Sequence, residues 1–393
     1  MYYKMKISIF KSGLIVGALA FFISCDKDDT NGQTVSKKEV ITTYADIAYA
    51  NYQKAYEDAV VLETAINTFT ANPSETTFTA AKNSWKQSRE SYGTTEAFRF
   101  ADGPIDNADG PEGFINSWPL DENYIDYVQG NPTAGIINSL VSFPIISKDV
   151  LEGENGKNDN EKYVTVGYHA IEFLLWGQDL TAPSAKLPGQ RPYTDYVLVG
   201  GTALNQSRRA TYLKVCADLL TDHLLYVANQ WKTGGAYRTT FLAMNEDDAI
   251  KNMYRGVTTL ISAELPSERM EVALGNEDQE DEHSCFSDNT HRDIALNLQG
   301  AINIYQGTYG TIDGPSLEDL VQQANTTTYT ETQAQIALAT SSVAAMAIPF
   351  DYAISGGASS VEGAKVKVAV VAIKNLAKNI LDGATKIGIL VNS

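Results

Sequence analysis

The sequence has few cysteines. Its 393 residues contain three, at positions 25, 216 and 285. Because the first is expected to carry a lipid anchor, only Cys216 and Cys285 can pair, and the chain forms at most one internal disulfide. The dense disulfide framework of small secreted domains is therefore excluded, and the fold must depend on its hydrophobic core.

Several catalytic motifs are missing. The sequence contains no HExxH zinc-peptidase helix, no phosphate-binding loop, no GxGxxG ahead of a helix and no GxSxG nucleophile elbow. The signature of di-iron bundles, Glu-x-x-His on each of two helices, is replaced by a single reversed copy. These absences argue against the corresponding enzyme classes, and the catalytic residues of any enzyme activity stay unknown.

Basic residues are outnumbered by acidic ones. The chain has 30 Lys and Arg against 48 Asp and Glu, for a formal net charge of −18. Such a surface repels nucleic acid and anionic lipid but attracts cations. We therefore expect no nucleic-acid partner, whereas a metal ion is a plausible one.

The N-terminus has the features of a secretory signal peptide at residues 1–24. Three lysines precede an apolar run at residues 13–23, which is shorter than the roughly 20 residues that a membrane-spanning helix needs. The residues before Cys25 resemble a bacterial lipobox, so we expect lipidation of Cys25. A plain signal peptide is the alternative, because the usual leucine three places before the cysteine and the usual small residue just before it are absent.

Residues 25–38 are predicted to form the lipidated N-terminus and a polar tether. The protein should then lie in the cell envelope, anchored to the outer membrane. The acidic CDKDD sequence resembles signals that direct some Gram-negative lipoproteins outward, which leaves the periplasmic side and the cell surface both open. Cleavage would leave 369 residues, enough for two domains.

Apolar residues beyond the tether recur every three or four positions, which predicts helices. We expect an all-α protein of two helical bundles, because no segment shows the sustained period-two alternation of strands. The least helical stretch between long helices is 181–201, so the first bundle is placed at 39–190 and the second at 191–393. The predicted helices cover residues 40–69, 78–100, 134–151, 161–180, 203–232, 246–265, 289–305, 331–347 and 362–388.

The segment VGYHAIEFLLWG, residues 166–177, places two polar side chains in an apolar helix. His169 and Glu172 are three residues apart and therefore project from one face. They suit Zn²⁺ or iron, with further ligands from elsewhere. The alternative is a buried His–Glu hydrogen bond without a metal. Gly167 would allow another backbone to approach closely.

Two further segments carry polar clusters. The sequence EDEHSCFSDNTHRD at 280–293 contains His283 and His291, together with Ser287 and Asp288, either of which is a suitable N-cap for a helix starting near residue 290. A solvated acidic loop explains its first part.

In TEAFRFADGPID, residues 95–106, Glu96 and Arg99 are one helical turn apart. A local salt bridge between them is one interpretation. The other is that Glu96 and Asp106 supply oxygen ligands to a cation.

The stretch GYHAIEFLLWGQD is similar to the GxHxxE motif of the imelysin family, and the resemblance continues in most of residues 40–393, in the family's order. It implies two related helical bundles with the motif near their interface, so that His169 and Glu172 belong to the site. The neighbouring matched segments imply that the following residues lie close to it: Glu96, Arg99, Asp106, Ser287 and Asp288.

The resemblance leaves three functions to compare. The first is a metal-binding lipoprotein that serves iron acquisition, with iron or zinc as the ion and envelope iron-uptake proteins as partners. The second is a zinc peptidase, since the family is classed with the metallopeptidases; a hydrolytic zinc site needs three protein ligands and a base, and the sequence offers only two ligands. The third is a binding module for a small ligand or polysaccharide, using the 21 tyrosines.

Overall fold

The computed structural model describes residues 34–108 and 110–391. The predicted signal peptide, Cys25 and most of the tether lie outside the described residues. The described residues from 35 to 391 belong to one compact unit. Among the described helices, none is both long and apolar enough to cross a bilayer.

Helices make up almost all of the regular structure, which confirms the all-α prediction. The long helices are α1 (Lys37–Ala71), α2 (Glu75–Gly93), α8 (Gln206–Trp231), α10 (Glu246–Thr259), α12 (Thr290–Gln306), α14 (Thr326–Ala344) and α16 (Val361–Lys386). The shorter α-helices are α3 (Glu112–Ile115), α4 (Glu122–Ile125), α5 (Gly135–Asn138), α6 (Lys148–Glu154), α7 (Gly167–Trp176), α9 (Ala236–Leu242), α11 (Val272–Asn276), α13 (Leu317–Ala324) and α15 (Phe350–Ile354).

Tighter and wider turns complete the helical framework. A wide π-helix, η5 (Leu260–Glu271), continues α10 into α11. The 3₁₀ turns are η1 (Thr94–Phe98), η2 (Lys157–Asp159), η3 (Pro183–Ala185), η4 (Tyr193–Tyr196) and η6 (Gln279–Asp281). After α12, a small antiparallel hairpin joins β1 (Thr308–Tyr309) and β2 (Ile312–Asp313).

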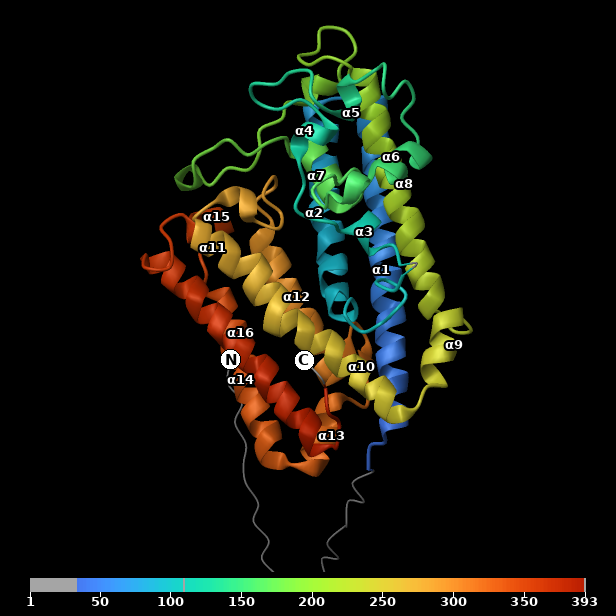
Figure 1. Ribbon diagram of the computed structural model, residues 1–393, viewed down its shortest axis with the longest axis vertical. Helices are drawn as coiled ribbons and strands as arrows, with labels where there is room; N and C mark the ends of the chain where they lie inside the picture. Colours follow the sequence, from blue (N-terminus) through green and yellow to red (C-terminus); the bar gives the residue numbers. More distant parts are fainter. Residues whose placement is uncertain (1–33, 109, 392–393) are drawn as a thin grey trace, which may run out of the picture. The chain divides into compact units, whose positions relative to one another are not determined.

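The helices pack in two groups (Figure 1). In the first, α1 packs along α2 and α8, and the short α7 packs against α2 and α8. In the second, η5 packs against α16 and α12, and α14 pairs with α16. The first group includes α8, although that helix lies beyond residue 190, where the sequence suggested a boundary. The division into two bundles at that residue stays a prediction.

Two helices of the first group, α1 and α2, begin with a capping box. Ser36 and Glu39 form a capping box at the start of α1, and Ser74 with Thr77 does the same for α2. The buried face of α1 follows the predicted three-four spacing. Trp85 of α2 donates a hydrogen bond from its indole N–H to the backbone oxygen of Tyr168 at 2.9 Å, so α2 directly supports α7.

Two predicted helices are shorter than expected. The region 134–151 contains α5 and α6 with an irregular segment between them. Pro144 lies in that segment, where it lacks an N–H donor and disfavours helix at the residue before it. The helix predicted at 161–180 is reduced to α7, bounded by Gly167 and by Gly177 at φ +68°. The cysteines Cys216 and Cys285 are both free and buried.

Candidate functional site

The site is built around α7, a helix whose ten residues are all buried. Gly167 begins it at φ +85°, a conformation that side chains rarely adopt. A Cβ at this position would lie 2.5 Å from the backbone oxygen of Ile115. The predicted close approach of another backbone is therefore confirmed, and that backbone belongs to α3.

His169 and Glu172 point into the same interior space, as their spacing predicted. The imidazole Nδ1 lies 3.0 Å from Glu172 Oε2. The other carboxylate oxygen, Oε1, accepts hydrogen bonds from the backbone N–H of Ser287 at 2.9 Å and from its hydroxyl at 2.7 Å. The second ring nitrogen, His169 Nε2, is buried without a hydrogen-bond partner among the described residues, and only 1% of the residue is exposed.

A second histidine–carboxylate pair lies beside the first. His283 Nδ1 is 2.9 Å from Asp293 Oδ2, and Ser284 donates its hydroxyl hydrogen bond to the same oxygen. The rings of His169 and His283 meet edge to face, with centroids 4.7 Å apart. Each histidine is thus held through Nδ1 by a carboxylate, and the two rings contact each other.

Burial sets the charge of this group. It lowers the pKa of His169 to about 3, with the charge of Arg89 as the next cause. It lowers the pKa of His283 to about 3 as well, followed by the effect of Arg269. Both imidazoles are therefore neutral at neutral pH, as metal ligands must be. Burial also raises the pKa of Glu172 to about 8, although the hydrogen bonds from Ser287 oppose this.

Asp293 is the permanent anion of the site. Burial alone would raise its pKa, but the charge of Arg89 and the hydrogen bond with His283 hold it well below its usual range. Arg89 is fully buried, and its Nε and Nη2 lie 3.2 Å and 3.1 Å from Asp293 Oδ1. The guanidinium also donates from Nη1 to Asn116 Oδ1 at 2.6 Å. This buried ion pair joins α2 to α12.

Glu96 belongs to an adjoining network. Burial opposes its ionisation, but the charges of Arg269 and Arg99 lower its pKa to about 2. Arg269 Nη2 lies 2.6 Å from Glu96 Oε2, whereas Arg99 Nη1 is 4.0 Å away. The predicted local pair with Arg99 is thus only a distant contact. The close ion pair is formed with a residue of η5, and Asn116 Nδ2 contacts the other carboxylate oxygen at 3.3 Å.

A polar pocket of about 280 Å³ adjoins these groups. Arg99, Glu112, Trp118, Arg269 and His283 are among its lining residues. Burial raises the pKa of Glu112 to about 7, and its Oε1 lies 3.3 Å from Arg99 Nε. His283 therefore borders a polar pocket, and its ring also contacts the ring of His169.

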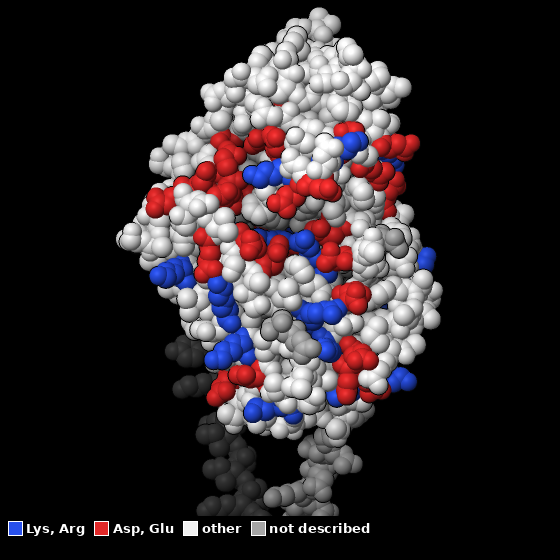
Figure 2. Space-filling model, viewed as in Figure 1, with Lys and Arg blue, Asp and Glu red and all other residues white. Residues whose placement is uncertain are grey.

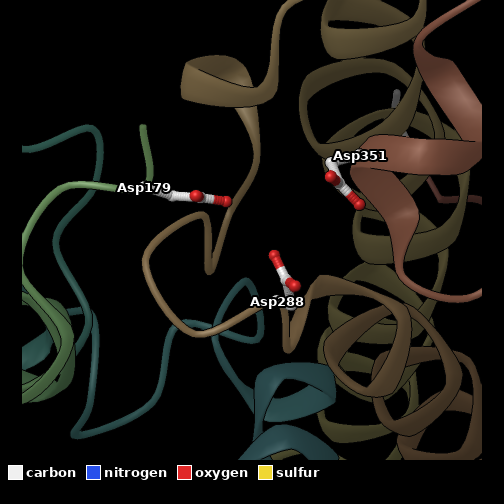
Figure 3. Close-up of side chains that lie close together, drawn as sticks. All are labelled: Asp179, Asp288 and Asp351. Atoms are coloured by element: carbon white, nitrogen blue, oxygen red, sulfur yellow. The ribbon is translucent and has the colours of Figure 1, made fainter. Parts of the chain in front are cut away.

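The remaining predicted residues have different surroundings. Asp106 is exposed and takes no part in the hydrogen bonds and ion pairs of the histidine group. Asp288 directs its carboxylate toward Asp179 and Asp351 (Figure 3). His291 is half-buried, and its Nδ1 lies 3.0 Å from the backbone oxygen of Asp288.

The predicted N-cap of α12 is wrong. The helix begins at Thr290, as expected, but its N-cap is Asn289, which makes no side-chain cap. Ser287 instead bonds Glu172, and Asp288 adopts a left-handed backbone conformation with φ +57°. The Ser287 side chain is therefore bonded to Glu172 of the buried site and does not cap the helix.

The buried histidines predict loss of stability in acid. Their pKa is about 6.5 in an unfolded chain and about 3 in the folded protein because of burial. Below pH 6.5 the unfolded state therefore binds more protons at these two side chains, and their contribution to stability falls as the pH drops from about 6.5 toward about 3. Buried carboxyls act in the opposite sense, because burial raises the pKa of Glu172 to about 8 and those of Glu112 and Asp288 to about 7. The histidine contribution is therefore measured as a difference between the wild-type protein and a variant.

His169→Gln removes one of the two imidazoles that must become charged in acid. Relative to the wild-type protein, its Tm should therefore rise as the pH falls from about 6.5 toward about 3, measured by thermal unfolding in buffers of matched ionic strength. A difference in Tm that stays constant across this range would contradict the assignment.

Comparisons with known proteins agree with this fold. A model of the imelysin family, Peptidase M75, matches residues 48–380. Iron-regulated protein A of Synechococcus elongatus is 23% identical over 371 residues, which cover 91% of this chain and 88% of that protein. A solved structure described as an iron-regulated protein A precursor, from Parabacteroides distasonis, has a TM-score of 0.70 at 19% identity and covers 91% of this chain and 97% of its own.

Proposed function

Since the chain belongs to the imelysin family, we propose that it is a cell-envelope protein that binds a transition-metal ion at the GxHxxE motif and takes part in iron acquisition. The observation that carries the proposal is the unpartnered Nε2 of His169, buried in a neutral imidazole. A buried polar atom without a partner is costly, and a metal ion is one partner that it can accept.

The surroundings of His169 fit a metal ligand. Histidines that bind metals usually donate their other ring N–H to a carboxylate, which fixes the tautomer and the ring orientation. Glu172 is in this position, because both of its oxygens are already engaged, one by His169 and one by Ser287. In this proposal His169 Nε2 is the ligand and Glu172 orients it. His283, held in the same way by Asp293, is the second candidate ligand.

Iron or zinc suits this donor set, because imidazole nitrogen is a preferred ligand of both. When bound, the ion would supply a positive charge that favours ionised Glu172. The acidic surface supports delivery of a cation. Figure 2 shows Asp and Glu side chains gathered across the middle of one face, below an uncharged top, with Lys and Arg among and below them. Lipidation of Cys25 would hold the protein at the outer membrane beside envelope iron-uptake proteins.

Metal titration tests the proposal. The purified protein, stripped with chelator, is titrated with Fe²⁺, Fe³⁺ and Zn²⁺ and the bound metal is measured. We expect binding of at least one ion at neutral pH, and an affinity at least about tenfold weaker in His169→Ala. His223→Ala is the matched control, because His223 pairs with Glu152 elsewhere on the surface of α8.

Binding of none of the three ions by the wild-type protein would contradict the proposal. Equal affinity in wild type and His169→Ala would contradict the assignment of the ligand. A loss in His223→Ala as large as that in His169→Ala would show that the effect is not specific to the site.

A peptidase is the second candidate function, and one observation favours it. Glu112 lies on the wall of the pocket that also borders His283, and its pKa of about 7 is suitable for a general base at neutral pH. Chelator-sensitive cleavage of an unfolded protein, lost in Glu112→Gln, would support this activity. The metal site described above does not depend on it.

A further inference from the structure

We propose that Asp179, Asp288 and Asp351 form a second metal site, which binds a hard divalent cation of the Ca²⁺ type. The three residues come from segments far apart in the sequence: the loop after α7, the segment before α12, and α15. Figure 3 shows their carboxylates directed toward a common space. One oxygen of each lies within 4.8 Å of those of the other two.

The spacing fits one ion. Ca²⁺ binds oxygen ligands at about 2.3–2.6 Å, so that two ligands on opposite sides of the ion lie up to about 5 Å apart. Three oxygens at the 4.8 Å limit would each lie about 2.8 Å from a common centre, so a small inward movement of the side chains brings them to the Ca–O distance. Ions that bind at about 2.0–2.1 Å, such as Mg²⁺, require the ligands to come closer. A donor set made only of carboxylate oxygens also favours a hard cation over a soft one.

The unpartnered oxygens are the second observation that points to an ion. Asp179 is 3% exposed and Asp351 is 2% exposed. Each has one engaged oxygen: Asp179 Oδ1 accepts from the backbone and hydroxyl of Thr181, both at 2.9 Å, and Asp351 Oδ1 accepts from the N–H of Tyr352. The Oδ2 atoms of both aspartates are buried and accept no hydrogen bond from the described residues. Burying a carboxylate oxygen without a hydrogen-bond donor is costly, and a bound cation would offset this cost.

Lysine and arginine side chains of the described residues do not neutralise these three carboxylates by close contact. Among the ion pairs of the described residues, none joins a Lys or Arg to the three aspartates at 4.0 Å or less. Lys86 and Lys186 act on Asp288 and Asp351 only from a distance. Burial raises the pKa of all three carboxyls, and repulsion from neighbouring aspartates adds to this at Asp288, whose pKa is about 7, and at Asp351, whose pKa is about 6. A divalent ion would relieve this repulsion.

Binding at this site would join α15 to the loop after α7. The site is separate from the histidine pair but close to it in sequence, because Ser287 bonds Glu172 and the next residue, Asp288, belongs to the aspartate group. A bound cation would thus fix the segment that positions Glu172. The proposal does not depend on a metal at His169.

Thermal unfolding tests the site. The chelator-treated protein is melted at pH 8 with CaCl₂ and, separately, with NaCl of the same ionic strength, which controls for screening. We expect saturating Ca²⁺ to raise the Tm by about 3 °C or more above the NaCl value. Asp351→Asn and Asp179→Asn should lose most of this rise and bind Ca²⁺ at least about tenfold more weakly by calorimetry. The exposed-acid variant Asp222→Asn and the variant His169→Ala should keep it.

The Tm of each variant without Ca²⁺ shows whether the substitution itself disturbs the fold. Without Ca²⁺, Asp351→Asn should melt no lower than the wild-type protein, because it removes one of the repelling carboxylates and can still accept from Tyr352. A Tm in wild type that responds equally to Ca²⁺ and NaCl would overturn the proposal. So would a full Ca²⁺ response in both Asp351→Asn and Asp179→Asn.

Discussion

Replacing Asp293 with asparagine is expected to lower the free energy of unfolding by about 3–5 kcal/mol. The substitution keeps the size of the side chain but leaves the guanidinium of Arg89 buried without its charge partner. Breaking a buried ion pair by removing one partner costs far more than losing an exposed pair, because the remaining charge stays desolvated. The free energy is measured by urea unfolding at neutral pH.

Asp222→Asn is the matched control for this substitution. Asp222 pairs with Lys148, and its side chain is 57% exposed. Its removal should cost less than about 1 kcal/mol. A loss in Asp293→Asn as small as that of the control would show that the Arg89–Asp293 pair does not hold α2 and α12 together.

Gly167→Ala is expected to cost about 2–4 kcal/mol of stability, the second large effect. Two causes add: the backbone at φ +85° disfavours any side chain, and the new Cβ would lie 2.5 Å from the backbone oxygen of Ile115. Since α7 and α3 must then move apart, metal affinity at His169 should fall as well. Urea unfolding and metal titration of the same variant measure the two effects.

Gly153→Ala provides the comparison. Gly153 lies within α6, its φ is not positive, and a Cβ there would meet no atom within 4 Å. Alanine should therefore leave stability unchanged or increase it by up to about 1 kcal/mol. If Gly167→Ala were as stable as Gly153→Ala, the close packing of α7 on α3 would be wrong.

Local patterns in the sequence were sufficient for the helices and for part of the site. The three-four spacing of apolar residues predicted the long helices, because each packs one face against neighbours. The spacing of His169 and Glu172 predicted a shared helix face, and their Nδ1–Oε2 distance of 3.0 Å confirms that they meet. Gly167 signalled the close approach of another chain segment, which proved to be α3.

Long-range partners could not be found in this way. One of the two interpretations of Glu96 paired it with Arg99, three residues away, yet its close partner is Arg269 in η5. Local spacing also gives no sign of the ion pair between Arg89 and Asp293, because 204 residues separate them. A pair of buried charges leaves no periodic signal in the sequence, because each member looks like an ordinary surface residue until the fold brings them together.

The aspartate site shows this limit most clearly. Asp179, Asp288 and Asp351 lie on three separate segments, and only their arrangement in space makes them a group. Asp288 also illustrates competition between levels of structure. Its local sequence favours a helix cap. In the structure, however, Ser287 donates its hydroxyl hydrogen bond to Glu172, and the backbone of Asp288 is left-handed with φ +57°.

Anomalous diffraction from crystals of the iron- or zinc-loaded protein tests the central claim most directly. We predict an anomalous peak at about 2.0–2.1 Å from His169 Nε2, with Glu172 still bonded to Nδ1 on the far side of the ring. A bound metal whose peaks lie away from His169, whether at His283 alone or only among the three aspartates, would contradict the assignment of the GxHxxE histidine as a ligand.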